Sequence, residues 1–124
     1  MRSLLTICLA LTCSFAYAQK VTQTPGPEYA IILHLMPQYQ ADSVWTDDDK
    51  AAVGMHFAAL QKLQREGKLV FAGRTTNAAS TGFIILKNMT EAEARAVLAE
   101  DPAVRRGIMS AEFQPFQTAL KEKK

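Results

Sequence analysis

The order of strand-like and helix-like segments is the feature that most constrains how this chain can fold. Runs of β-branched and other apolar residues mark four strands, and apolar residues spaced by three and four mark two helices. The expected elements are a strand at 29–36, a helix at 46–66, strands at 69–72 and 82–86, a helix at 90–100 and a strand at 108–113. This βαββαβ order is that of the ferredoxin-like fold. We therefore predict an α+β domain in which a four-stranded antiparallel sheet carries two helices on one face.

Both predicted helices begin with recognisable capping residues. Thr46 is a favourable N-cap, and the acidic run 47–49 suits the positive end of the helix dipole. That run lacks the alternation and the glycine of an EF-hand loop, so we do not interpret it as a calcium site. Thr90 and Glu93 form a capping box for the second helix.

The first strand is apolar on both of its faces. A sheet with one face open to water alternates more cleanly between apolar and polar residues. We therefore expect a second subunit to cover the face that the helices leave free, which predicts a homodimer. One side of the strand carries Tyr29, Ile31, Leu33 and Leu35, and the other carries Ala30, Ile32, His34 and Met36.

Residues 1–18 have the pattern of a secretory signal peptide. Arg2 provides the positive start, an apolar run follows, and Ala16-Tyr17-Ala18 fits the cleavage pattern. We predict cleavage after Ala18 and a periplasmic or secreted protein. A membrane anchor is the alternative, but it needs about 20 continuous apolar residues. Both cysteines of the chain leave with this segment, so we expect no disulfide in the mature protein.

The remaining chain is expected to form one domain. Residues 19–28 are predicted to be a flexible leader, 29–118 the folded domain and 119–124 a charged tail. The 124 residues include 14 Lys and Arg against 12 Asp and Glu, and this balance excludes the strongly basic footprint of a nucleic-acid-binding protein. Nothing after residue 18 is long and apolar enough to span a membrane. The partners we expect are a small molecule and a second copy of the chain.

His56 is the most informative residue for function. It falls on the apolar stripe of the first helix, which consists of Val53, Phe57, Leu60 and Leu63. A histidine on a buried face must find partners for two ring nitrogens. It is either a core residue bonded to a backbone carbonyl or the floor of a pocket, where its ring moves a proton near neutral pH.

Asp101 is the second candidate for catalysis. Because it precedes Pro102, it is a good N-cap for a short helical turn, and that role alone explains it. Next to His56, however, its carboxylate would fix the tautomer of the ring and stabilise the imidazolium. The sequence does not show whether the two side chains touch.

His34 and Arg74 are the candidate binding residues. His34 lies on the first strand, where it either lines the cavity or sits at the subunit interface. Arg74 follows Gly73 at a strand end and is either a solvated loop cation or the group that holds an anionic substrate. Two histidines without metal-ligand spacing do not make a metal site, and no phosphate-binding glycine loop is present in the sequence, so we predict no metal and no cofactor.

Three stretches of the chain carry a resemblance to a known family. They are HFAALQKLQREGKLVFAG at 56–73, GFIILKN followed by TEAEA at 82–94, and EDPAVRRGI with FQPF at 100–116. Together they resemble the YCII-related family. The resemblance implies a ferredoxin-like subunit that pairs into a dimeric α+β barrel, with a histidine–aspartate pair at His56 and Asp101. It also implies lyase or isomerase steps on small cyclic or aromatic compounds, including a dehydrochlorination.

Two features depart from the common form of that family: the predicted signal peptide and a short loop between the middle strands. The leading hypothesis is a cofactor-free acid–base lyase or isomerase that acts through His56 and Asp101 on a small organic compound. The alternatives are a dimer that binds a small molecule without chemistry, and a purely structural domain. The structural alternative predicts that His56 is enclosed, with both nitrogens bonded.

Overall fold

The computed structural model describes residues 25–123, and the predicted signal peptide at 1–18 lies outside them. The predicted order of strands and helices is confirmed. Two short 3-10 turns and a one-turn helix add to it. The elements are β1 (Glu28–Leu35), η1 (Pro37–Gln40), η2 (Asp42–Val44), α1 (Asp47–Arg65), β2 (Leu69–Arg74), β3 (Thr81–Leu86), α2 (Glu91–Ala99), α3 (Pro102–Arg105) and β4 (Met109–Phe116).

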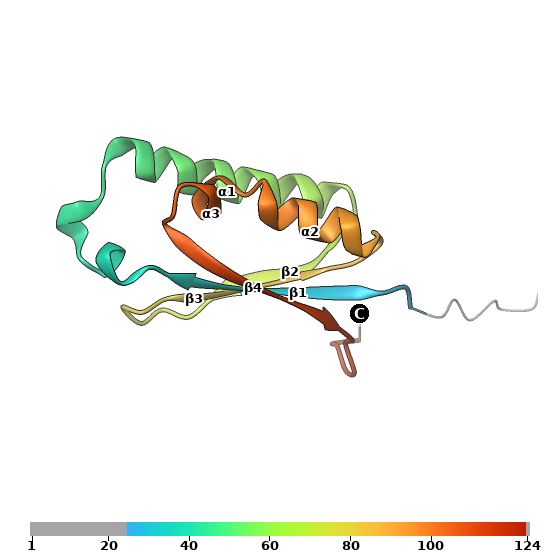
Figure 1. Cartoon of the computed structure of the whole chain (residues 1–124). Coiled ribbons are helices and arrows are strands. Elements are labelled where there is room, and N and C mark those ends of the chain that lie inside the picture. The colour runs from blue at the N-terminus through green and yellow to red at the C-terminus, as the bar shows by residue number, and fades with distance from the viewer. Residues whose placement is uncertain (1–24, 124) are drawn as a thin grey trace, which may run out of the picture.

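The four strands form one antiparallel sheet in the order β2-β3-β1-β4, so β3 and β1 are its central strands. All three α-helices lie on one face of this sheet (Figure 1). The predicted α+β ferredoxin-like fold is therefore confirmed. No helix within residues 25–123 is long and apolar enough to cross a bilayer.

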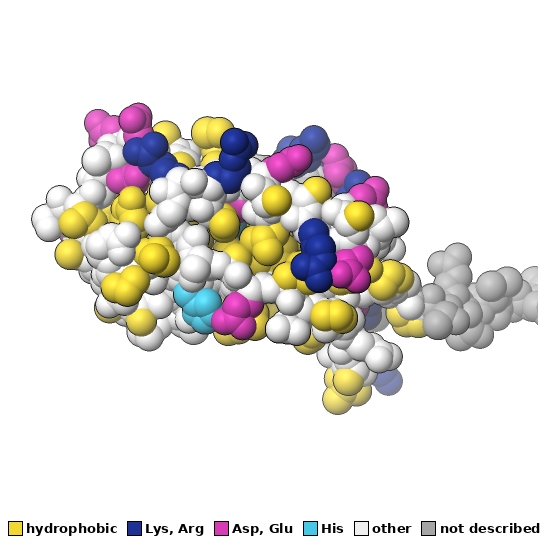
Figure 2. All heavy atoms as spheres, viewed as in Figure 1, with side chains coloured by type: hydrophobic (Ala, Val, Ile, Leu, Met, Phe, Trp, Pro, Cys, Tyr) yellow, Lys and Arg dark blue, Asp and Glu magenta, His cyan; other side chains and the backbone are white. Residues whose placement is uncertain are grey.

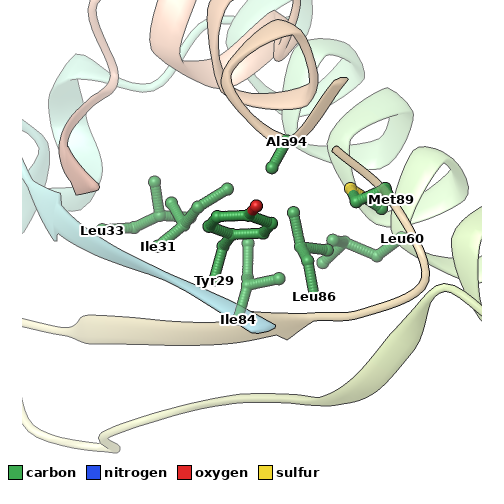
Figure 3. Packing of buried hydrophobic residues seen from close by; sticks show 8 residues of the cluster. All are labelled: Tyr29, Ile31, Leu33, Leu60, Ile84, Leu86, Met89 and Ala94. Carbon is green, nitrogen blue, oxygen red and sulfur yellow. The ribbon is translucent and has the colours of Figure 1, made fainter. Parts of the chain in front are cut away.

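The main core lies between the sheet and the helices. Ile31 on β1 faces Ile84 on β3 and Phe113 on β4, so these three side chains point to the same side of the sheet. Complete burial of a side chain such as Ile31 or Leu86 contributes about 1.5–3 kcal/mol to stability. Figure 3 shows the cluster, which consists of Tyr29, Ile31, Leu33, Leu60, Ile84, Leu86, Met89 and Ala94.

The predicted N-cap Thr46 and the predicted capping box of Thr90 and Glu93 are both present, and Thr46 also belongs to a capping box. Thr46 accepts a hydrogen bond from the backbone of Asp49, whose side chain accepts one from the backbone of Thr46. Thr90 and Glu93 make the same reciprocal pair at the start of α2. These local signals were readable because each requires only four consecutive residues.

The prediction that Phe57 belongs to the buried stripe of α1 was wrong. Phe57 is 60% exposed, whereas Ala52, His56 and Leu60 are buried. Phe57 follows His56 and is therefore turned by about 100° around the helix axis, away from the line of contact with the sheet. A second difference is that the middle strands are longer than predicted, since β2 continues through Arg74.

The sheet face opposite the helices carries mainly apolar residues on β1 and β3 and polar residues on much of β4. By the strand register, Ile32 on β1 lies beside Phe83 on β3 and Glu112 on β4, and all three point to that second face. Phe71 and Phe116 on this face are 51% and 41% exposed. Figure 2 views the molecule from the side and not onto this face; on that side, hydrophobic side chains form a band below the helices, and charged side chains gather along the helix layer.

Asp49 connects three segments at the start of α1. Its Oδ2 accepts hydrogen bonds from the backbone nitrogen of Thr46 at 2.9 Å and from the Thr46 hydroxyl at 2.8 Å. Its Oδ1 accepts one from Nε of Arg106 at 2.6 Å and a longer one from the Tyr39 hydroxyl at 3.4 Å. The hydrogen bond from Arg106, followed by that from the Thr46 backbone, lowers the pKa of Asp49 from 3.8 to about 2.

This depressed pKa predicts that Asp49 contributes to stability only while it is ionised. Since the pKa is lower in the folded chain than in the unfolded one, the contribution is complete above about pH 4 and is lost as the pH falls towards 2. We expect Asp49→Asn to lower the free energy of unfolding at pH 6, and the difference from wild type to shrink between pH 4 and 2. Urea unfolding followed by circular dichroism measures both quantities. Asp47→Asn, in an exposed acid of the same turn, is the control, and a difference for Asp49→Asn that stays constant across this pH range would contradict the account.

Candidate functional site

A cleft of about 700 Å³ lies between the sheet and α1, bounded by the 3-10 turns and by the loop between β2 and β3. Small residues at two helix-facing positions of the sheet, Ala72 and Gly82, leave room for it. Arg74 on β2 pairs with Gly82 on β3, and Gly82 in turn pairs with Leu33. A Cβ atom added to Gly82 would lie 3.3 Å from the Cβ of Leu33, so even a methyl group would crowd this floor.

Two aromatic residues form one wall of the cleft. Nε1 of Trp45 donates a hydrogen bond of 2.9 Å to the backbone oxygen of Tyr39. The two rings meet edge to face, with their centroids 5.0 Å apart. This contact fixes the irregular segment 37–45 as a wall, and both side chains line the cleft.

His56 lines the same cleft from α1 and contacts Asp101. Its Nδ1 lies 2.5 Å from Oδ2 of Asp101, and each residue is 9% exposed. The structure thus brings together the two residues that sequence analysis singled out for catalysis, although they are 45 positions apart. Their catalytic role stays a prediction.

Asp101 is held in place by the helix that it caps. Its Oδ1 accepts hydrogen bonds from the backbone nitrogens of Ala103 at 2.9 Å and Val104 at 3.1 Å. The two oxygens therefore have separate tasks, one at the N-terminus of α3 and the other at the imidazole. Asp101 therefore does both things that the sequence suggested for it: it caps α3, and it contacts His56.

The second ring nitrogen of His56, Nε2, is open to the cleft. Within residues 25–123, every enclosed side-chain nitrogen or oxygen has a hydrogen-bond partner, and Nε2 makes no hydrogen bond to these residues. It is therefore accessible. Because a carboxylate only accepts hydrogen bonds, pairing with ionised Asp101 places a proton on Nδ1. In the neutral ring, Nε2 then presents a lone pair to whatever occupies the cleft.

The sheet separates the two predicted binding residues. Arg74 lines the cleft, and its guanidinium makes a single long hydrogen bond of 3.4 Å, to the carbonyl of Thr75. His34 points to the second face, where its Nε2 lies 2.8 Å from Oε1 of Glu112. His34 does not line the cleft, so the structure places only Arg74 near His56.

Sequence analysis missed several polar and aromatic residues of the cleft. Tyr39 and Trp45 come from the segment between β1 and α1, and Asn77 and Ser80 come from the loop between β2 and β3. No periodic pattern marks residues in such segments. The available signal was the cluster of aromatic residues before Thr46, which by itself does not indicate a binding wall.

A smaller groove of about 390 Å³ lies between α1 and α2. Its floor shares Leu33, Leu60 and Ile84 with the cleft, and Asp101 lines it. His56 and Asp101 therefore stand between two hollows, and His56 lines the larger one.

Comparison with known proteins gives a match to a family model and matches to solved structures. The family model described as "YCII-related domain" matches residues 28–116. The structure of 5-chloro-2-hydroxyhydroquinone dehydrochlorinase from Burkholderia phenoliruptrix, in complex with 2,5-dihydroxybenzoquinone, aligns with a TM-score of 0.55 and 19% identity. The alignment covers 73% of this chain and 93% of that chain, and at this identity it shows the fold. Among curated protein sequences, none matches this chain.

Proposed function

This chain belongs to the YCII-related family, and on that premise we propose that it is a cofactor-free lyase or isomerase acting on a small organic compound. In this proposal His56 is the acid–base group, Asp101 orients it and Arg74 binds an anionic part of the substrate. Export through the segment 1–18 to the periplasm or the medium belongs to the same proposal.

The observation that carries the proposal is the unequal environment of the two nitrogens of His56. Nδ1 is bound to a buried carboxylate, whereas Nε2 opens into a cleft large enough for a small ring compound. Such an arrangement fixes the ring while leaving one nitrogen free to take up a proton. It does not match the structural alternative, which requires both nitrogens to be bonded.

The geometry suits a proton abstraction that begins an elimination or an isomerisation. Nε2 of His56 takes a proton from the substrate, and the ring becomes an imidazolium that the Asp101 carboxylate stabilises. In an elimination, the electron pair left behind forms a new π bond, and the leaving group departs with its bonding pair. In an isomerisation, the imidazolium returns the proton to another atom of the substrate. Neither route requires electrons from an outside donor.

The lining of the cleft favours a flat compound with a negative group. Tyr39, Trp45 and Phe57 offer aromatic surface against which a ring can pack. Of the described residues that line the cleft, Arg74 alone carries a permanent positive charge. The similar structure supports this class of compound, because that protein is a dehydrochlorinase crystallised with a dihydroxybenzoquinone.

We also propose that two copies of the chain pair through the second face of the sheet. Phe71 and Phe116 leave much of their aromatic surface open there. Exposed apolar residues gathered on one face mark an association surface rather than an ordinary water-facing sheet.

The first prediction from the proposed function is that substitution of His56 abolishes most of the turnover. With 5-chloro-2-hydroxyhydroquinone as the probe and chloride release as the readout, we expect His56→Ala and His56→Gln each to lower kcat about 10²- to 10⁴-fold. Asp101→Asn is expected to lower kcat as well, while it still caps α3, since Asn is as good an N-cap as Asp. His34→Gln, in the other histidine of the chain, is the matched control and should retain full activity.

Full turnover in the His56 variants would refute the proposed mechanism. Calorimetric titration with 2,5-dihydroxybenzoquinone separates catalysis from binding. If the quinone binds in a His56-dependent manner and no compound of this class is converted, the chain is a binding protein.

The second prediction concerns Arg74. We expect Arg74→Gln to weaken binding of an anionic ring compound, such as ionised 2,5-dihydroxybenzoquinone, about 10- to 100-fold, because a hydrogen bond to a charged group contributes about 1.5–3 kcal/mol. The expected kinetic signature is a higher KM with little change in kcat. Arg105→Gln, an exposed arginine of α3 outside the cleft, is the control. Equal affinity in wild type and Arg74→Gln would remove Arg74 from the site.

The third prediction concerns the oligomeric state. Light scattering coupled to size-exclusion chromatography should give wild type a mass about twice that of the chain, and Phe71→Glu should shift it to the monomer. Phe57→Glu is the matched control, since Phe57 is 60% exposed but lies on α1. A monomeric wild type, or an equal effect of both substitutions, would contradict pairing through the sheet.

A further inference from the structure

The helix that supplies the Asp101 carboxylate is too short to hold its own position. α3 consists of the four residues Pro102–Arg105. One helical turn is not stable in isolation, because forming the first turn fixes several residues for a single hydrogen bond. The direction in which Asp101 points therefore depends on what binds α3 to the rest of the domain.

α3 is bound to α1 at both of its ends. At the N-cap, Oδ2 of Asp101 contacts Nδ1 of His56, and at the C-cap, Nε of Arg106 donates a hydrogen bond of 2.6 Å to Oδ1 of Asp49. Asp49 and His56 are seven residues apart, close to two turns of α1, so they lie on the same face of that helix. The two contacts form a brace between one face of α1 and the two ends of α3.

Small buried residues fill the space inside this brace. Ala52 lies on α1 between Asp49 and His56, and Ala103 lies on α3 between its two ends. Together with Ile108 they form a separate buried cluster, in which Ala103 and Ile108 are 0% exposed. Alanines at this contact allow the two helices to approach closely, so a shift of α3 would have to break apolar packing as well as two polar contacts.

The Asp49 end of the brace differs from an ordinary surface ion pair. Glu91 and Arg95 on α2 form such a pair at 2.8 Å, with both side chains more than half exposed. In contrast, the side chain of Asp49 is 5% exposed and is already fixed by Thr46, while that of Arg106 is 41% exposed. Because Asp49 is already held in one position, its contact with Arg106 fixes the end of α3 better than an ion pair between two mobile side chains would.

We propose that Asp49 and Arg106 are positioning residues, which set the contact between His56 and Asp101 by fixing the far end of α3 against α1. This inference rests on the proposed function, because it gives Arg106 the role of keeping the catalytic histidine–aspartate pair in the correct geometry. Arg106 does not line the cleft, and its hydrogen bond goes to Asp49 and not to His56. Its influence passes through the backbone of α3.

The test measures the His56 ring directly and then turnover. Nitrogen-15 NMR of the imidazole distinguishes a ring with its proton held on Nδ1 from a mixture of tautomers. In Arg106→Gln we expect the Nδ1 and Nε2 resonances to move towards that mixture, and kcat for 5-chloro-2-hydroxyhydroquinone to fall about 2- to 30-fold with little change in KM. Arg106→Lys, which keeps a charged donor, should return both the His56 resonances and kcat part of the way to their wild-type values. Asp49→Asn tests the same contact from the other helix and should shift the same resonances.

Arg95→Gln is the control, because it removes an ion pair of similar length, together with a cation–π contact to Phe113, from a helix that does not carry the histidine–aspartate pair. The inference is overturned if Arg106→Gln and Asp49→Asn leave the His56 resonances unchanged, or if Arg95→Gln shifts them equally. The proposed function fails separately, when His56→Ala retains full turnover. Unchanged resonances in the Arg106 variants combined with an inactive His56→Ala would reject the positioning role alone.

Discussion

The Asp101 carboxylate caps the N-terminus of α3 with one oxygen and contacts the His56 imidazole with the other. The rest of the site depends on these two interactions. A buried carboxylate is costly unless its oxygens are hydrogen-bonded. Here two backbone nitrogens of α3 donate to one oxygen and the His56 ring lies against the other, so burial leaves neither oxygen without a partner. This arrangement also fixes the tautomer of His56. A group that is needed to start a helix is thereby placed to orient a base.

The cleft arises because the two ends of the helix-facing side of the sheet carry residues of different size. At the end covered by α2, large side chains such as Ile31 and Leu86 fill the space and stabilise the domain. At the other end, Ala72 and Gly82 occupy helix-facing positions, and the same layer is left hollow. α1 spans both ends, so Leu60 packs into the core while His56, one turn earlier, borders the cleft. The site is therefore a part of the core layer that was left unfilled, and the packed end supports it.

Sequence patterns could predict the order of elements and both helix starts, because each depends on neighbouring residues. They could not place Arg74, whose orientation is decided by an irregularity. Leu69 pairs with Leu86, but the register shifts before Phe71, which pairs with Ile85. Without that bulge, Arg74 would stand opposite Thr81 and point to the second face, whereas with it Arg74 stands opposite Gly82 and points to the helices.

Sequence patterns were likewise insufficient to predict the geometry of the candidate site. The residue types at His56 and Asp101 were informative, since a histidine on an apolar stripe and an aspartate before proline each allow few roles. The contact between them depends on how α3 docks against α1, and no periodicity encodes this. The resemblance to a family pointed to the pair, and the structure supplies its geometry. The wall formed by Tyr39 and Trp45 lies in the segment 37–45, where only the folded chain shows which side chains face inward.

The second face of the sheet also carries a polar pair, His34 and Glu112. The contact between these two side chains affects whether a partner can cover that face. His34 and Glu112 are 43% and 57% exposed at the side chain and already lie 2.8 Å apart. They stand on neighbouring strands among apolar residues such as Ile32 and Phe83. A partner that covers this face would bury two polar side chains that already contact each other. Burying such a pair opposes association less than burying a lone carboxylate would. Because the sheet separates this face from the cleft, a partner bound here leaves the open nitrogen of His56 accessible from the helix side.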